Sequence, residues 1–423
     1  MTTLPYVALI RGMDQSEQNG PLTGLRIIEF GHFIAAPFAT RLLADMGAEV
    51  IKVEPPGGDP VRTWGAQVDG QSLWWSVHAR NKKCVTLNLK APEAREIAMG
   101  LIAKSDAVVE NFRPGLMEKF GLGPDELSRV RPGLPLVRVS GFGQTGPRAM
   151  DASFGMIGEA IGGIRHLTGY PAEQSDLPPV RTGVSLGDTV AGLYGAVGLL
   201  AVLQEQRMQP PAADAPARVV DVALTESVLS LLEGVLPDYG ALGKVRQPTG
   251  SRIMTAAPSN AYLCADDRWA IIGANSPPLF EKLMICIGKP HFVSDPRFVD
   301  NDSRLTNVVA LDAEITEWTR ARPSAEILAD LHQAGIPSSK IYDAEDIVAD
   351  QQYQARRAVC PVTDPLHGQD ILHPTPVPRF SGGPDSKIAW AGPAIGANTR
   401  PVYRELLGMD DQTFDRLTAD GTI

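Results

Sequence analysis

Short apolar strands alternate with helices through the first third of the chain. Strand patterns occupy residues 25–30, 49–54, 107–112 and 136–140, and helical patterns occupy residues 37–46 and 91–104. Because the connections are short, these segments are expected to form right-handed βαβ units and therefore a parallel sheet. Ligands bind such sheets at the carboxyl ends of the strands. The sequence thus predicts an α/β fold with a site near residues 31–33, 54–55, 111–113 and 141–143.

One carboxylate lies in an otherwise uncharged segment, residues 183–200. Asp188 follows a turn-forming Pro-Pro-Val-Arg-Thr-Gly stretch, so it is expected where a loop passes into a helix. The free N–H groups and positive dipole end of a helix start favour an ionised carboxylate, which can act as a nucleophile. The alternative from the residues alone is that Asp188 only caps the helix. The glycines at 192, 195 and 198 indicate close helix packing in a core rather than a membrane span.

Composition narrows the class of partner. The formal net charge of −10 argues against nucleic acid or an anionic membrane as the main partner. The four cysteines and seven histidines have no metal-type spacing, so no metal site is predicted and the thiols are expected to be reduced. The apolar run at residues 6–10 lacks the flanks of a signal peptide, and a cytoplasmic location is expected.

A glycine motif at residues 141–146 matches G-x-G-x-x-G and follows a strand. Pro147 comes next, however, and no helical pattern opens at the third glycine. Without that helix the motif does not predict a dinucleotide cofactor.

Beyond residue 204 the chain changes character. Residues 204–218 are polar and rich in proline, which indicates a loop or linker, and residues 219–232 have the pattern of a strand that leads into a helix. Strand patterns at 260–264 and 269–272 flank a turn, which indicates a hairpin. With 423 residues, two domains or one elaborated domain are expected.

Several motifs, in order along the chain, resemble the class III coenzyme A transferases. They are residues 21–32 (PLTGLRIIEFGH), 43–54 (LADMGAEVIKVE), 81–90 (NKKCVTLNLK), 109–123 (VENFRPGLMEKFGLG), 139–147 (VSGFGQTGP), the segment around Asp188 and residues 406–409 (LLGM). The resemblance covers nearly the whole chain from about residue 20. It implies a Rossmann-like parallel-sheet large domain built from both termini, a smaller central α+β domain, and an interlocked homodimer. The implied boundaries are 1–204 and 326–423 for the large domain, 205–256 for a linker and crossing segment, and 257–325 for the small domain.

The resemblance also implies the chemistry and the site. Asp188 falls on the position of the catalytic aspartate, which attacks a donor acyl-CoA to form a mixed anhydride and later carries CoA as an aspartyl thioester. No cofactor is permanently bound, since CoA thioesters are the substrates. The residues implied in CoA binding are His32, Phe33, Ala35, Asn111, Phe112 and Lys119, with Lys82 and Lys83 as candidates for phosphate contact. For the lysine pair the alternative is a solvated surface pair, and for His32 a structural histidine.

Residues 153–165 resemble the subgroup that uses succinyl-CoA and dicarboxylic acids. Arg165 and Arg181 are candidates for the distal carboxylate, because arginine suits bidentate pairing with carboxylates. The alternative is a structural salt bridge from either arginine to Glu159 or Asp176. The expected acceptor is a small dicarboxylate such as itaconate, mesaconate, citramalate or glutarate, or an aromatic succinate.

Two other functions are weighed. The same fold serves α-methylacyl-CoA racemases, in which a histidine shortly after the Gly-Gln-Thr-Gly-Pro motif acts as a second base. This chain has no histidine at residues 150–155, and His166 does not match, so racemization is the lesser interpretation. The third possibility is a subunit of a hetero-oligomeric CoA transferase that needs a different partner subunit.

Overall fold

The computed structural model describes residues 19–423, which divide into two compact units. Unit 1 contains residues 19–164, 182–236 and 354–423 of this range, and unit 2 contains residues 165–181 and 237–353. The apolar run at residues 6–10 lies outside the described residues.

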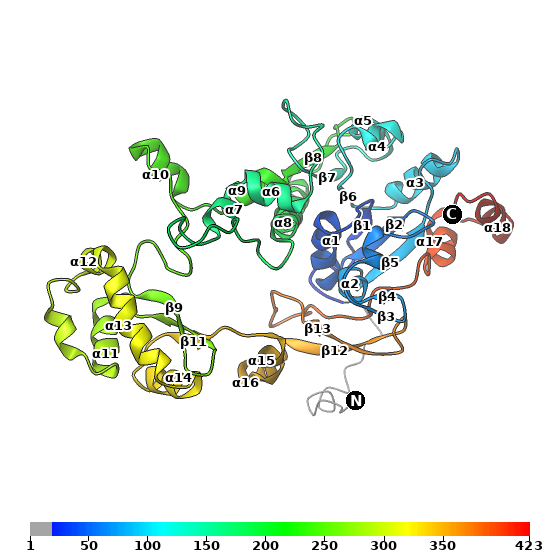
Figure 1. Cartoon of the computed structure of the whole chain (residues 1–423). Helices are drawn as coiled ribbons and strands as arrows, with labels where there is room; N and C mark the ends of the chain where they lie inside the picture. The colour runs from blue at the N-terminus through cyan, green and yellow to red at the C-terminus, as the bar shows by residue number, and fades with distance from the viewer. Residues whose placement is uncertain (1–18) are drawn as a thin grey trace. The chain divides into compact units, whose positions relative to one another are not determined.

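Six parallel strands form the main sheet of unit 1, in the order β5-β2-β1-β6-β7-β8 (Figure 1). They are β1 (Arg26–Glu29), β2 (Glu49–Glu54), β5 (Lys82–Thr86), β6 (Ala107–Glu110), β7 (Pro135–Ser140) and β8 (Arg218–Ala223). The four strands predicted in the first third of the chain are confirmed as β1, β2, β6 and β7, and the parallel pairing is confirmed as well. β5 was not predicted, because two lysines open it and obscure its apolar pattern.

Helices cover both faces of this sheet. They are α1 (Ala35–Asp45), α2 (Leu73–His78), α3 (Ala94–Ala103), α4 (Leu116–Lys119), α5 (Pro124–Val130), α6 (Gly155–Ile161), α8 (Leu186–Met208), α9 (Leu224–Leu229), α17 (Thr399–Leu407) and α18 (Asp411–Ala419). Successive strand residues point to opposite faces, so Ile27 packs with α1 and α8 whereas Ile28 packs with α3 and α17. Smaller elements are a 3₁₀ turn, η2 (Pro60–Thr63), and the pairs β3 (Gln67–Val68) with β4 (Gln71–Ser72) and β12 (Val359–Asp364) with β13 (Gln369–Pro374).

The glycines of α8 allow that helix to approach its neighbours closely. A Cβ added at Gly192 would lie 2.7 Å from the carbonyl oxygen of Ala35, and one at Gly198 would lie 2.6 Å from Val220 Cγ1. Neither position has room for a larger residue, which confirms the interpretation of these glycines as packing residues. By length and composition α8 is the one helix within residues 19–423 that could cross a membrane, a test that core helices also meet.

The C-terminal part of the chain closes the edge of the sheet at β5. Asn398 Oδ1 accepts from Cys84 N–H at 2.9 Å, and Thr399 Oγ1 accepts from Thr86 N–H at 3.0 Å. Tyr403, in α17, donates its hydroxyl to the Thr86 carbonyl at 2.9 Å. These bonds satisfy backbone groups of an edge strand that has no neighbouring strand on that side.

Unit 2 is built around an antiparallel sheet in the order β11-β10-β9. Its strands are β9 (Ser259–Leu263), β10 (Trp269–Gly273) and β11 (Ser338–Lys340), and its helices are α11 (Pro277–Cys286), α12 (Asn301–Thr306), α13 (Val308–Arg320), α14 (Ser324–Gln333) and α15 (Ala344–Ala349), with a 3₁₀ turn η3 (Pro290–Ser294). Three helices, α7 (Ile164–Leu167), α10 (Val235–Leu242) and α16 (Gln351–Ala355), contain the points where the chain passes between units. The predicted β9–β10 hairpin is confirmed.

Candidate active site

Asp188 lies in the first turn of α8, as predicted, and its side chain is half-buried. The N-cap of this helix is Ser185, so Asp188 is not the N-cap residue itself but lies three residues further along. A carboxylate in the first turn of a long helix is favoured in its ionised form by the aligned peptide dipoles. The position therefore suits an anionic nucleophile.

The Asp188 carboxylate packs directly against Gly155, the first residue of α6. A Cβ added at Gly155 would lie 2.0 Å from Asp188 Oδ2 and 2.7 Å from its Cγ. A second glycine completes the contact, because a Cβ at Gly187 would lie 2.7 Å from the carbonyl oxygen of Gly155. The absence of a side chain at Gly187 lets the two helix starts meet, and its absence at Gly155 leaves room for the Asp188 carboxylate. Sequence reasoning missed Gly155, which is distant in the chain from Asp188 and carries no local signal of this contact.

A second carboxylate is buried beside the start of α8. Glu159 lies one turn after Gly155 in α6 and is 1% exposed. The Gly187 N–H points to Glu159 Oε1 at 3.5 Å. From the sequence, Glu159 was expected only as a possible salt-bridge partner of Arg165 or Arg181. Its i, i+4 spacing from Gly155 places both residues on the face of α6 that meets α8.

The predicted CoA-binding residues around the first and third strands come together at the carboxyl edge of the sheet. Asn111, after β6, accepts from the His32 N–H at 2.8 Å and donates to the His32 carbonyl at 2.8 Å. The rings of His32 and Phe112 lie 5.2 Å apart. Burial and the nearby Lys52 ammonium lower the pKa of His32, so its ring is neutral at pH 7. Ala35 is the first residue of α1 and is buried.

A pocket of about 220 Å³ opens at this edge. Its walls are mostly apolar, with one lysine and one glutamate, and come from His32, Val53, Glu54, Pro55, Leu87, Asn88, Leu89, Lys90, Phe112, Leu116 and Phe120. A concave apolar site with ring-bearing side chains and few polar groups is suited to a planar organic group.

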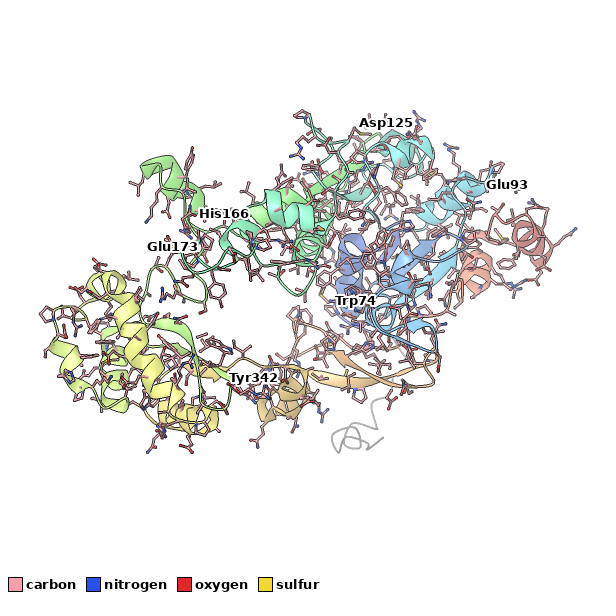
Figure 2. All side chains as sticks on the ribbon, viewed as in Figure 1. Trp74, Glu93, Asp125, His166, Glu173 and Tyr342 are labelled. Carbon is pink, nitrogen blue, oxygen red and sulfur yellow. The ribbon has the colours of Figure 1, made fainter. Side chains whose placement is uncertain are left out.

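Phe33 connects this edge with the surroundings of Asp188. Its ring lies edge-on to Phe154 at 6.4 Å, and Phe154 immediately precedes Gly155. The Phe33 ring also lies 4.9 Å from Trp64, which in turn lies 6.3 Å from Trp74, labelled in Figure 2. Aromatic side chains thus extend from the turn beside this pocket to the surroundings of Asp188, within one unit.

The three lysines of the predicted CoA site occupy different environments. Lys82 is fully buried, with its ammonium 2.8 Å from Glu29 Oε2 and 2.8 Å from the Pro37 carbonyl, so it is not a solvated surface residue. Lys83 pairs with Glu49, which begins β2, and so lies at the amino edge of the sheet, opposite the pocket. Neither placement fits a phosphate contact, because the Lys82 ammonium is enclosed in the interior and Lys83 lies at the amino edge of the sheet. Lys119, at the end of α4, is exposed.

The arginines predicted to bind the acceptor belong to unit 2, whereas Asp188 belongs to unit 1. Arg165, in α7, points Nη1 to the Pro179 carbonyl at 3.5 Å, and Arg181 is exposed. His166, the histidine weighed for a racemase, has Nε2 3.0 Å from the Arg246 carbonyl within unit 2. Among residues 19–423 no group of three or more histidine, cysteine or acidic side chains is arranged to hold a metal ion.

Comparison with known proteins assigns the family. A model of CoA-transferase family III matches residues 22–399. A relative named succinyl-CoA–D-citramalate CoA-transferase, from Chloroflexus aurantiacus, is 42% identical over 405 residues, covering 95% of this chain and 98% of that protein. The mouse succinyl-CoA:glutarate CoA-transferase is 31% identical and matches 95% of this chain and 90% of its own length. The crystal structure of a CaiB/BaiF family protein from Brucella suis superposes with a TM-score of 0.80 at 31% identity, over 92% of this chain and 100% of that one. The chain therefore belongs to CoA-transferase family III, the CaiB/BaiF family, and is a CoA transferase.

Proposed function

We propose that the enzyme transfers CoA from succinyl-CoA to a small dicarboxylate through covalent intermediates on Asp188. The observation that carries this proposal is the contact between the Asp188 carboxylate and Gly155, at the first turn of a long helix. The carboxylate there is held against backbone, with no side chain between it and the start of α6. Such an arrangement presents a fixed anionic nucleophile.

The proposed reaction balances without any other reagent. Asp188 attacks the thioester carbonyl of succinyl-CoA, the C–S bond breaks, and CoA leaves as a thiolate. The thiolate attacks the Asp188 acyl carbon of the anhydride, which releases succinate and leaves an aspartyl-CoA thioester. The acceptor carboxylate then displaces CoA to form a second anhydride, and the thiolate attacks the acceptor's acyl carbon. The new acyl-CoA leaves and Asp188 is regenerated.

We place the nucleotide end of CoA in the pocket at the carboxyl edge of the sheet. His32 and Phe112 supply rings for the base, and Phe33, Ala35 and Asn111 shape the turn beside it. The exposed Lys119 is near enough in sequence to the pocket wall to offer a phosphate contact. Lys82 and Lys83 are not part of this proposal.

For the acceptor we propose a dicarboxylate, with citramalate tested first and malate, glutarate, itaconate, mesaconate and an aromatic succinate after it. The names of the relatives favour this class, since they include the citramalate and glutarate enzymes and a succinyl-CoA–L-malate CoA-transferase beta subunit from Chloroflexus aurantiacus, 35% identical over 414 residues. Arg165 and Arg181 are proposed to bind the distal carboxylate. We also propose that the enzyme is cytoplasmic and acts as an interlocked homodimer.

The test is a mass-resolved exchange assay with succinyl-CoA and each acid. One new acyl-CoA with matching free succinate is expected, and Asp188→Ala should abolish exchange while leaving the fold unchanged. Turnover like that of the wild type in Asp188→Ala would refute the mechanism. Acceptor-independent exchange of the substrate α-proton in deuterated water would instead indicate a racemase.

A second candidate follows from the relative that is one subunit of a two-subunit enzyme. In that case the purified chain binds CoA but does not exchange it until another subunit is added. Exchange by the purified chain alone would exclude this possibility.

A further inference from the structure

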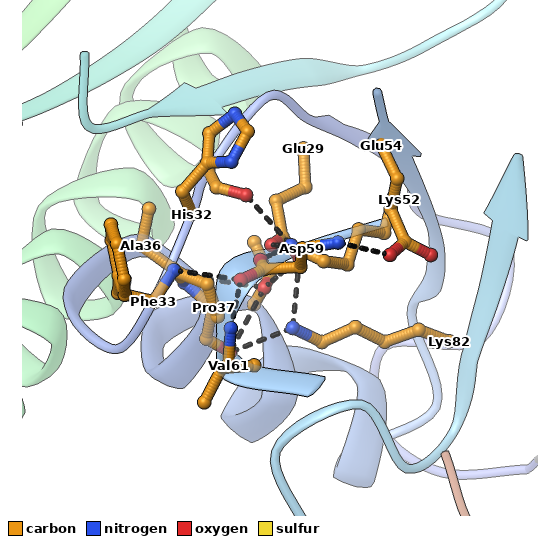
Figure 3. A network of polar contacts seen from close by, with 12 residues as sticks. Glu29, His32, Phe33, Ala36, Pro37, Lys52, Glu54, Asp59, Val61 and Lys82 are labelled. Carbon is orange, nitrogen blue, oxygen red and sulfur yellow. Dashed lines mark hydrogen bonds and ion pairs between the residues drawn. The ribbon is translucent and has the colours of Figure 1, made fainter. Parts of the chain in front are cut away.

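Buried side chains hold the turn that follows β1 from both ends. Lys52 Nζ donates to the Gly31 carbonyl at 2.7 Å, and Asp59 Oδ1 accepts from the Phe33 N–H at 3.2 Å. The residue between them, His32, is bound through both its N–H and its carbonyl by Asn111. Figure 3 shows Lys52 and Asp59 gathered beside the turn that carries His32 and Phe33.

Lys52 and Asp59 belong to a charged network in the interior. Lys52 Nζ lies 2.7 Å from Asp59 Oδ2 and 2.8 Å from Glu29 Oε1, and Lys82 Nζ lies 2.8 Å from Glu29 Oε2. All four side chains are at most 2% exposed. Burial alone would raise the pKa of Asp59, but Lys52 and the Val61 N–H lower it below its usual value, so Asp59 stays ionised.

The turn needs this support because its conformation is strained. Phe33 has φ of +60°, in the left-handed region that non-glycine residues rarely adopt. Holding a residue there costs free energy, which the surroundings must offset. In this conformation of the turn, the Phe33 ring lies against Phe154 beside Gly155, while the adjacent His32 lines the pocket.

We propose that Lys52 and Asp59 are positioning residues for CoA. They fix the turn so that His32 lines the nucleotide pocket and Phe33 packs against the start of α6. The identity of the ligand rests on the proposed function, whereas the hydrogen bonds to the turn do not.

Asp59 offers a sharp test because three donors converge on its two oxygens. Lys52 Nζ contacts Oδ2, while the N–H groups of Phe33 and Val61 contact Oδ1. An amide has one acceptor oxygen and one NH₂ group, so Asp59→Asn can satisfy Lys52 or the two N–H groups but not both. The substitution keeps the size of the side chain and removes half of its acceptors.

The matched control is Asp45→Asn. Asp45 forms a similarly buried pair with Arg80 at 2.6 Å, with side chains 3% and 2% exposed, and its hydrogen bonds go to Arg80 and Asn81 rather than to residues 31–33. Both variants lose one carboxylate of a buried ion pair in unit 1, so they are expected to lose comparable stability. Only Asp59→Asn disturbs the turn.

The experiment measures the dissociation constant for CoA by calorimetry, with urea unfolding of each variant. We expect Asp59→Asn to weaken CoA binding at least about tenfold and Asp45→Asn to leave it within about twofold, since misplacing binding groups by an ångström carries penalties of this size. The double variant Lys52→Met/Asp59→Asn removes one charge of each sign, leaving Glu29 with Lys82. It should be more stable than Lys52→Met alone and still bind CoA weakly.

Equal CoA affinity in Asp59→Asn and Asp45→Asn, or recovered affinity in the double variant, would overturn the positioning role. Failure of the proposed function has a different signature. In that case the wild-type enzyme itself would not bind CoA, or Asp188→Ala would retain exchange activity.

Discussion

Replacing Gly155 with alanine tests whether the Asp188 carboxylate acts where the structure places it. The added methyl group would lie 2.0 Å from Asp188 Oδ2, whereas ordinary contacts begin at 3.4 Å. The carboxylate must therefore retreat by more than about 1 Å, a displacement that costs about 100-fold in rate for a positioned nucleophile. That loss corresponds to about 3 kcal/mol of transition-state stabilisation.

The same substitution should not destabilise the protein much, and this difference makes the test specific. Gly155 has a backbone conformation open to other residues, and alanine favours helix over glycine by up to about 1 kcal/mol. Single-turnover kinetics with succinyl-CoA would give the chemical rate, and urea unfolding would give the stability.

Gly183→Ala is the control for the Gly155 substitution. It also adds a methyl group on the approach to α8, but no atom lies within 4 Å of the new Cβ. Its rate should remain within about threefold of the wild type, as expected for a surface change without new contacts. If Gly155→Ala reacted as fast as Gly183→Ala, the inferred role of the carboxylate geometry would be refuted.

Three further outcomes are expected. Burial, opposed by Arg138, raises the pKa of Glu110 from 4.5 to about 7. Between these pH values the folded protein keeps a proton that the unfolded chain releases. The protonated Glu110 therefore contributes stability that is fully present below pH 4.5 and is lost as the pH rises through 7. Glu110→Gln should therefore change the difference in unfolding free energy between pH 5 and pH 8 by about 3 kcal/mol relative to the wild type, as measured by urea unfolding. The same pH difference in the variant and the wild type would contradict the raised pKa of Glu110. Burial, with Arg80, lowers the pKa of His373 to about 3, so its contribution is present above pH 6.5 and lost as the pH falls toward 3. Urea unfolding should therefore show that His373→Asn loses about 3 kcal/mol less stability than the wild type when the pH falls from 6 to 4. Equal losses in the two proteins would mean that the His373 ring has an unshifted pKa. Leu116→Trp should fill part of the pocket and raise the KM for succinyl-CoA about tenfold with little change in kcat, and an unchanged KM would mean that the nucleotide lies elsewhere.

The sequence was sufficient for the parallel sheet and for the place of Asp188 at the start of a helix, because both depend on local patterns. Apolar runs between short connections define β1, β2, β6 and β7, and a single charge in residues 183–200 identifies the aspartate. The contact of Gly155 with Asp188 depends on how two helices cross, which no local pattern records.

The environments of Lys82 and Lys83 also could not be predicted from local sequence. Two adjacent lysines are typical of a solvated surface, yet Lys82 is buried, and its ammonium donates hydrogen bonds to Glu29 and to the Pro37 carbonyl. Only the register of β5 against β2 shows that both lysines begin their strand, with Lys83 beside Glu49 and the Lys82 side chain enclosed against Glu29. Their placement is a property of the sheet rather than of the dipeptide.

Two opposite structural features fix the two ends of the proposed acyl-CoA site, and substitutions in each should have separable effects. At Asp188 the chain omits side chains, since Gly155 and Gly187 let the helix starts touch. At the turn after β1 it adds buried charge, since Lys52 and Asp59 bind backbone groups that no strand pairs. Gly155→Ala moves the Asp188 carboxylate without contacting the pocket, so it should lower the chemical rate and leave CoA affinity near that of the wild type. Asp59→Asn moves His32 and Phe33 together, so its main effect should be a loss of CoA affinity. The chemical rate should fall only to the extent that Phe33 displaces the start of α6.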